Sequence, residues 1–103
     1  MTPPERTADE RRRALDRAQE VRRERASIRT ALKSGSLDPM AALDDVRCAG
    51  ARVRWFLESL PGVGAARAET LMRDLAIAPT RRLAGLSDRQ RAGLTAHLRA
   101  DAR

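Results

Sequence analysis

The stretch Leu60-Pro61-Gly62-Val63-Gly64-Ala65-Ala66-Arg67-Ala68 decides the fold, because two glycines and a proline interrupt an otherwise helical sequence. Apolar residues recur at helical spacing on both sides of it: Val53, Phe56, Leu57 and Leu60 before it, and Ala68, Leu71, Met72 and Leu75 after it. Pro61 ends the first of these helices, because the residue before a proline avoids helical geometry. Gly62 and Gly64 supply the backbone freedom of a tight turn. The pattern predicts two short helices joined by this turn, the second running from Ala65 to Leu75.

The same stretch has the form of a helix-hairpin-helix element. Its glycines leave the turn amides uncovered, and these amides together with the next helix N-terminus suit a backbone phosphate. We expect Val63 to anchor the turn in the core and Arg67 to lie near the phosphate, one turn into the helix. Such a site recognises the nucleic-acid backbone rather than its base sequence. The alternative is a turn that serves the fold alone.

The chain before the turn begins with one long predicted helix. After an irregular start at Pro3 and Pro4, Thr7 and Glu10 have the spacing of a capping box. Gly35 suits the C-terminal cap, so the helix spans about 27 residues, which is long for a globular protein. Its apolar stripe is Ala14, Ala18, Val21, Ile28 and Leu32, with Arg25 as an interruption. The bulkier C-terminal half is expected to pack and the first half to project.

Helix signals continue through the rest of the sequence. Asp38-Pro39 starts a second helix, predicted to end between Cys48 and Gly50. Thr80 is expected to cap a short turn ending at Gly85, and Ser87 with Gln90 forms a capping box for a last helix that ends near residue 100. The predicted fold is therefore all-α. A long basic N-terminal helix (residues 1–35) precedes a compact bundle of short helices (residues 36–103).

Charge points to a polyanionic partner. The chain has 103 residues, a net charge of +7 and 21 basic residues against 14 acidic ones. Residues 1–35 carry +4 (10 basic, 6 acidic), residues 36–58 carry −1 (3 basic, 4 acidic) and residues 59–103 carry +4 (8 basic, 4 acidic). This balance favours nucleic acid and suggests a packed centre with a basic surface at each end.

Two pairs of arginines lie beside predicted turns. Arg81 and Arg82 follow the break at Pro79, and Arg52 and Arg54 flank the start of the third helix. If the glycine turn and the turn at Arg81 face the same way, they can clamp one duplex backbone. The alternative for Arg81 and Arg82 is solvated surface charge. The arginines of the first helix have the same two interpretations, and their interleaved acidic residues favour a solvated face.

Several functional classes lack their sequence signatures. Cys48 is the single cysteine and His97 the single histidine, so we expect no disulfide framework, metal site or cofactor. No apolar run reaches membrane-spanning length, and the N-terminus has no apolar signal core. We therefore expect a cytoplasmic protein without membrane contact. Lys33 is the only lysine and lies far in sequence from the glycine turn, so no catalytic function is expected.

The sequence resembles the actinobacterial integration host factor family. The resemblance is dense at Leu57-Glu58-Ser59-Leu60-Pro61-Gly62-Val63-Gly64, at residues 71–75 and at Ile77-Ala78-Pro79-Thr80-Arg81-Arg82-Leu83. It extends to Arg12-Arg13-Ala14-Leu15 and to residues 22–26 and 32–35 of the first helix and its C-terminal cap. The family is all-helical, with a helix-two-turns-helix DNA module. Members usually have a basic residue where this chain has Ala65 and another where it has Ala84, so this chain is a divergent member.

The resemblance implies a nucleoid-associated architectural protein that binds double-stranded DNA with little sequence preference and can assist a phage integrase. We expect a monomer in the absence of DNA. Scarce aromatic residues argue against single-strand recognition, but an RNA- or ribosome-associated role for the same module remains the alternative. The predicted DNA-binding residues are Gly62, Val63, Gly64, Ala65, Arg67, Arg81, Arg82, Arg52 and Arg54.

Overall fold

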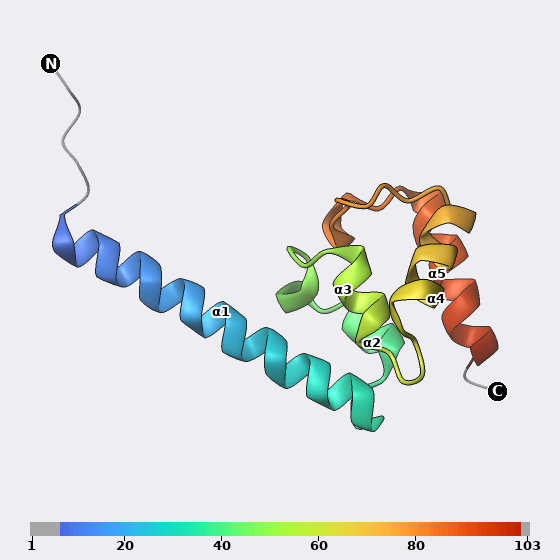
Figure 1. Ribbon diagram of the computed structural model, residues 1–103, viewed down its shortest axis with the longest axis horizontal. Coiled ribbons are helices and arrows are strands. Elements are labelled where there is room, and N and C mark those ends of the chain that lie inside the picture. Colours follow the sequence, from blue (N-terminus) through green and yellow to red (C-terminus); the bar gives the residue numbers. More distant parts are fainter. Residues whose placement is uncertain (1–6, 102–103) are drawn as a thin grey trace, which may run out of the picture.

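The computed structural model describes residues 7–101, so the irregular start predicted at Pro3 and Pro4 lies outside the described range. The described chain is helical, with one isolated antiparallel bridge in place of a sheet (Figure 1). Its elements are α1 (Ala8–Ser34), α2 (Pro39–Leu43), the 3-10 turn η1 (Val46–Cys48), α3 (Val53–Glu58), α4 (Ala65–Asp74), the 3-10 turn η2 (Leu83–Gly85) and α5 (Asp88–Asp101). The all-α prediction is confirmed.

The long first helix has the predicted length and caps. The Thr7 hydroxyl accepts a hydrogen bond from the Glu10 amide, and the Glu10 carboxylate accepts one from the Thr7 amide. Gly35 ends α1 with a φ of 80°, a left-handed conformation that favours glycine. Only the C-terminal part has buried residues, Ile28 and Leu32. The other half projects away from the remaining helices, as predicted (Figure 1).

Arg25 connects α1 to the loop before α3. The sequence pattern made this residue an interruption of the apolar stripe. In the structure Arg25 is half-buried, and its Nη2 lies 3.3 Å from where a Cβ on Gly50 would stand. The absence of a side chain at Gly50 therefore lets α1 approach the segment that follows η1.

The second predicted helix is wrong in its C-terminal half. Asp38 caps α2 through the Ala41 amide as expected, but the helix ends at Leu43 and the chain restarts as η1. Asp45 causes the restart, because its carboxylate accepts a hydrogen bond from the Arg47 amide at 2.8 Å. An aspartate that caps a new turn competes with continuation of the helix before it. Val46 is consequently 85% exposed instead of contributing to the apolar face.

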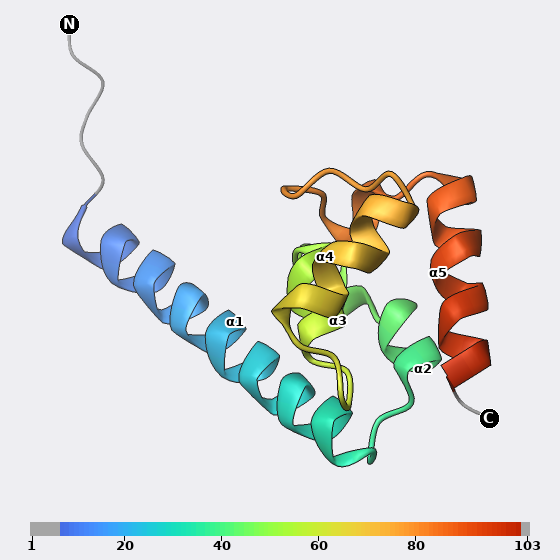
Figure 2. The same cartoon turned by 45° about the vertical axis from the view of Figure 1, so that its right-hand side comes forward.

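The core lies between the short helices and the end of α1. α3 packs against α4, and α2 packs against α5 (Figure 2). Phe56, Leu57, Leu32 and Leu94 are fully buried. Trp55 packs against the edge of this core. The buried Ser59 donates its hydroxyl proton to the Trp55 carbonyl at 2.7 Å, so its burial leaves no unpaired hydroxyl donor.

A left-handed alanine ends α4. Ala76 has a φ of 54°, and the amide of Ile77 donates to the Met72 carbonyl at 2.8 Å. This bonding is that of a Schellman cap, in which glycine usually occupies the left-handed position. The Ala76 carbonyl also accepts from Gln90 Nε2 at 2.9 Å, and Gln90 forms the predicted capping box with Ser87. The cap of α4 is thereby joined to the start of α5.

Replacing Ala76→Gly should stabilise the protein by about 0.5–1 kcal/mol, because glycine adopts the left-handed conformation without steric cost. Thermal unfolding followed by circular dichroism measures the change. Ala66→Gly, in the exposed first turn of α4, is the matched control and should destabilise. A loss of stability in Ala76→Gly would contradict the strain argument.

The Cys48 thiol should react slowly in the folded protein. Its side chain is buried, and burial raises the pKa of the thiol, which reduces the reactive thiolate at pH 8. Labelling with a chromogenic disulfide should be much slower in buffer than in denaturing urea. Equal rates in the two conditions would contradict the prediction.

Candidate nucleic-acid interface

The glycine turn is built as a proline-glycine reverse turn. The Val63 amide donates to the Leu60 carbonyl at 3.2 Å, and Gly62 has a φ of 73°. Proline followed by a left-handed glycine is the pattern of a type II turn. Val63 is 7% exposed and belongs to the core, which confirms that it anchors the turn.

Gly64 differs from the prediction in its backbone conformation. Its φ of −96° and ψ of −174° are extended, so only Gly62 requires the conformational freedom of glycine. Gly64 is the N-cap of α4, and its carbonyl accepts the first helical bond, from Ala68. The amides of residues 65–67 precede that bond, and a Cβ on Gly64 would meet nothing within 4 Å. The start of α4 therefore offers uncovered donors at an open surface.

Arg67 is turned toward α5. Its Nη2 lies 3.1 Å from Asp101 Oδ2, in an ion pair whose side chains are both 53% exposed. Arg67 lies in the first turn of α4, directly after the glycine turn, and its guanidinium joins this turn to the end of α5. Its contact with a phosphate stays a prediction. An exposed ion pair of this kind contributes about 0–1 kcal/mol.

The second turn pairs with the chain before α3. Three amides donate across the two segments: Val53 to the Arg81 carbonyl (2.9 Å), Leu83 to Ala51 (3.0 Å) and Ala84 to Ala49 (2.9 Å). Residues 49–53 and 80–84 thus run antiparallel, with Arg52 opposite Arg82. The predicted cap by Thr80 is wrong, because η2 begins at Leu83 with Arg82 as its N-cap. Pairing with the distant segment has replaced the local cap.

This pairing places Arg52 and Arg82 side by side at the surface. Their bonding is that of a non-hydrogen-bonded antiparallel pair, in which the two Cα atoms lie about 4.5 Å apart and the side chains share a face. Ala51, Val53 and Leu83, on the opposite face, are buried. Arg52 Nη1 donates to the Thr80 carbonyl and Arg82 Nη1 to the Gly50 carbonyl, so each guanidinium is held against the opposite segment.

The neighbouring arginines complete a cluster, which we call the arginine cluster: Arg52, Arg54, Arg81 and Arg82. Arg81 Nη1 donates to the Gly85 carbonyl at 3.1 Å. Arg54 forms an ion pair with Glu58, one helical turn further along α3, with 3.9 Å between Arg54 Nη1 and Glu58 Oε1. In the described part of the chain, no ion pair involves the other three arginines. The cluster is therefore a concentration of positive charge with little local neutralisation.

The two turns lie at opposite ends of α4 (Figures 1 and 2). A helix of ten residues is about 15 Å long, so the glycine turn and the arginine cluster are separate places on the molecule. Contact of both turns with one duplex stays a prediction, and it would have to span the length of α4. Arg52 and Arg54, from the nearly neutral middle of the sequence, lie beside Arg81 and Arg82 of the C-terminal basic block.

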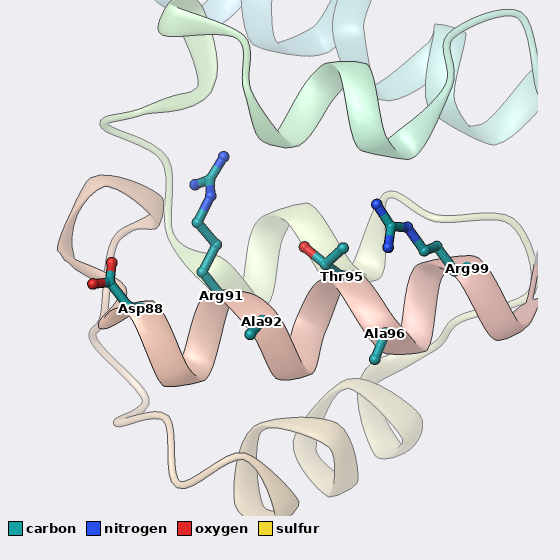
Figure 3. A pocket seen from close by; sticks show the side chains of 6 residues that line it. All are labelled: Asp88, Arg91, Ala92, Thr95, Ala96 and Arg99. Carbon is teal, nitrogen blue, oxygen red and sulfur yellow. The ribbon is translucent and has the colours of Figure 1, made fainter.

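Two arginines of α5, Arg91 and Arg99, help to line a surface hollow of about 390 Å³ (Figure 3). Arg91, Thr95 and Arg99 point to the same side of the helix. Arg91 forms an ion pair with Asp44 and donates to the Leu43 carbonyl, which joins α5 to α2.

Over residues 7–101, no group of three or more His, Cys, Asp or Glu side chains is arranged to hold a metal ion. No helix in that range is long and apolar enough to span a membrane.

Comparison with known proteins gives concordant results. The S13-like H2TH domain model matches residues 21–98. Integration host factor of Mycolicibacterium smegmatis and that of Mycobacterium tuberculosis are each 41% identical over 98 residues, covering 91% of this chain and 93% of the relative. Integration host factor of Streptomyces coelicolor is 38% identical over 102 residues, covering 91% of this chain and 92% of the relative.

A solved structure described as sIHF bound to an 8bp palindromic DNA matches with a TM-score of 0.71 and 33% sequence identity. The match covers 81% of this chain and 98% of the solved chain. Sequence, helical architecture and domain model therefore agree, and the chain belongs to the integration host factor family, with an S13-like H2TH domain.

Proposed function

We propose that this protein binds double-stranded DNA through the sugar-phosphate backbone, with little dependence on base sequence, and acts as a non-catalytic architectural protein of the nucleoid. The observation that carries the proposal is the exposed Arg52–Arg82 pair, which two chain segments hold at one place on the surface. The solved relative, which is described as bound to DNA, supports the same ligand class.

Electrostatics explains why the pair suits a phosphate. Like charges directly opposite each other across paired segments destabilise the folded protein. Arg52 and Arg82 nevertheless occupy such positions, and hydrogen bonds to Thr80 and Gly50 hold their guanidinium groups there. A phosphate that accepts from both would relieve the repulsion and gain charge-assisted hydrogen bonds. A bound anion would therefore stabilise this arrangement.

The glycine turn supplies a second backbone contact in this proposal. The uncovered amides at the start of α4 favour an anion through both hydrogen bonding and the helix dipole. Gly64 has no side chain to block the approach, and the exposed Ala65 leaves the surface open. Backbone contacts in the segments before and after α4 would fix the protein on a duplex without reading bases.

The proposed cellular role of the protein is to shape DNA. A sequence-tolerant protein with contacts at both ends of one helix can shape the duplex that it binds, which suits a nucleoid protein and an accessory role beside a phage integrase. Membership in the integration host factor family supports this role. DNA in the nucleoid is the proposed partner and location, and the unbound protein is proposed to be a monomer.

Replacing Arg52→Ala or Arg82→Ala should each weaken binding to a duplex of about 20–30 base pairs roughly tenfold, as expected for one charged hydrogen bond. The magnitude of the negative slope of log affinity against log salt should decrease by about 0.9 in each variant. Stability should change by less than about 1 kcal/mol, because the lost hydrogen bond and the relieved repulsion oppose each other.

The control for these variants is Arg89→Ala, an exposed arginine at the start of α5 that removes the same charge elsewhere. Matched double-stranded RNA tests the RNA alternative. Wild-type binding that is independent of salt would overturn the proposal, as would tighter binding to the RNA duplex. Equal effects of Arg82→Ala and Arg89→Ala would remove the arginine cluster from the contact.

Replacing Gly64→Ala should preserve stability to within about 0.5 kcal/mol and weaken DNA binding, because the new methyl group meets no protein atom but covers the open amides. Gly62→Ala should instead destabilise by about 1 kcal/mol, since its φ is left-handed. Chemical denaturation and duplex titration separate the two effects. Unchanged affinity in a folded Gly64→Ala variant would exclude a phosphate at these amides.

A further inference from the structure

A small hollow lies between α3 and α4, on the flank of the arginine cluster. Its volume is about 240 Å³, and Arg54, Glu69, Met72, Arg73, Ile77 and Pro79 line it. Sites that enclose drug-sized ligands measure about 300–1,000 Å³, so this hollow suits one chemical fragment rather than a whole nucleoside. None of the residues predicted from sequence as DNA-binding lies on its α4 wall.

Two residues that line the hollow, Arg54 and Pro79, lie close in sequence to the Arg52–Arg82 pair. Pro79 directly precedes Thr80, whose carbonyl accepts from Arg52, and Arg54 lies two residues after Arg52 at the start of α3. An extended phosphate chain that contacts the pair would therefore pass the mouth of the hollow. A backbone that continues along this flank meets α4 at Arg73.

The lining combines an apolar floor with charged walls. Met72 is 3% exposed and Ile77 6% exposed, and both belong to the core. Arg54 and Arg73 come from different helices, and no ion pair of the described residues involves Arg73. Apolar carbon flanked by guanidinium groups matches a deoxyribose, whose carbon edge is apolar and whose two neighbours are phosphates.

We propose that this hollow takes a sugar-phosphate unit of the bound duplex and that Arg73 is a further phosphate contact beside Arg54. The inference rests on the proposed DNA binding and extends its footprint from the second turn onto α4. Glu69 precedes Arg73 by one helical turn and lines the same hollow. Its carboxylate faces the incoming phosphate and limits the affinity, so α4 contributes one residue of each sign to the hollow.

The opposite signs give a paired test. Arg73→Ala should weaken binding to a 20–30 base-pair duplex several-fold and reduce the magnitude of the salt slope by about 0.9. Glu69→Gln should tighten binding to the same duplex, because it removes a negative charge without changing the shape of the side chain. Both residues are exposed, so both variants should keep the wild-type melting temperature.

The controls remove the same kinds of charge outside this hollow. Asp74, the last residue of α4, and Arg89, in the first turn of α5, line a separate hollow, so Asp74→Asn and Arg89→Ala measure the effect of net charge alone. The proposal requires Arg73→Ala to weaken binding more than Arg89→Ala and Glu69→Gln to tighten it more than Asp74→Asn. Equality within either pair would overturn the proposal.

Failure of this inference is distinguishable from failure of the proposed function. If wild-type binding depends on salt and on Arg52 and Arg82 but not on Arg73, the duplex contacts the cluster without entering the hollow. If wild-type protein shows no salt-dependent binding to the duplex, DNA binding itself is wrong and the inference falls with it.

Discussion

The antiparallel pairing of residues 49–53 with residues 80–84 is the constraint on which the arrangement of the basic surface depends. Three backbone hydrogen bonds join the segments, and Arg52 stands opposite Arg82. The same pairing buries Ala51, Val53 and Leu83 behind the arginines, so the core and the charged surface are two faces of one feature. α1 packs against one of the paired segments, because the Arg25 side chain lies against Gly50. If the two segments separated, the arginines would disperse and the core would open at the start of α3.

The local parts of the fold could be predicted from the sequence. The capping boxes at Thr7 and Ser87, the start at Asp38-Pro39 and the stop at Pro61 each depend on residues a few positions apart. The break after Leu43 does not follow from the sequence, because Asp44 and Asp45 come directly after a helical apolar pattern. Only the hydrogen bond from the Arg47 amide to the Asp45 carboxylate shows that η1 starts there. The candidate site could be predicted by residue but not by arrangement. No periodicity relates residues 49–53 to residues 80–84, and the direction of each turn depends on how α3 and α4 pack.

The arginine side chains make two kinds of interaction. Arg67 and Arg91 form ion pairs with Asp101 and Asp44, and those pairs join α5 to α4 and α2. Arg52, Arg81 and Arg82 instead donate to backbone carbonyls, which fixes their direction and leaves their charge unneutralised by ion pairs in the described chain. Counting charges along the sequence cannot separate these interactions, because the same residue type makes both. The distinction depends on which acidic residues the fold brings within reach, so the ion pair between Arg67 and Asp101 could not be predicted from the sequence.

The exposed half of α1 has a consequence for how the molecule responds to its surroundings. Leu15 and Val21 are 55% and 44% exposed, so the first turns gain little from packing. Their helicity rests on the capping box and the intrinsic propensities of the chain, and short helical segments without tertiary support are marginal in water. We therefore expect warming to unwind α1 from its N-terminus before the core unfolds. On that expectation, amino-acid changes in the exposed turns would alter how far α1 extends from the other helices with little effect on the stability of the core.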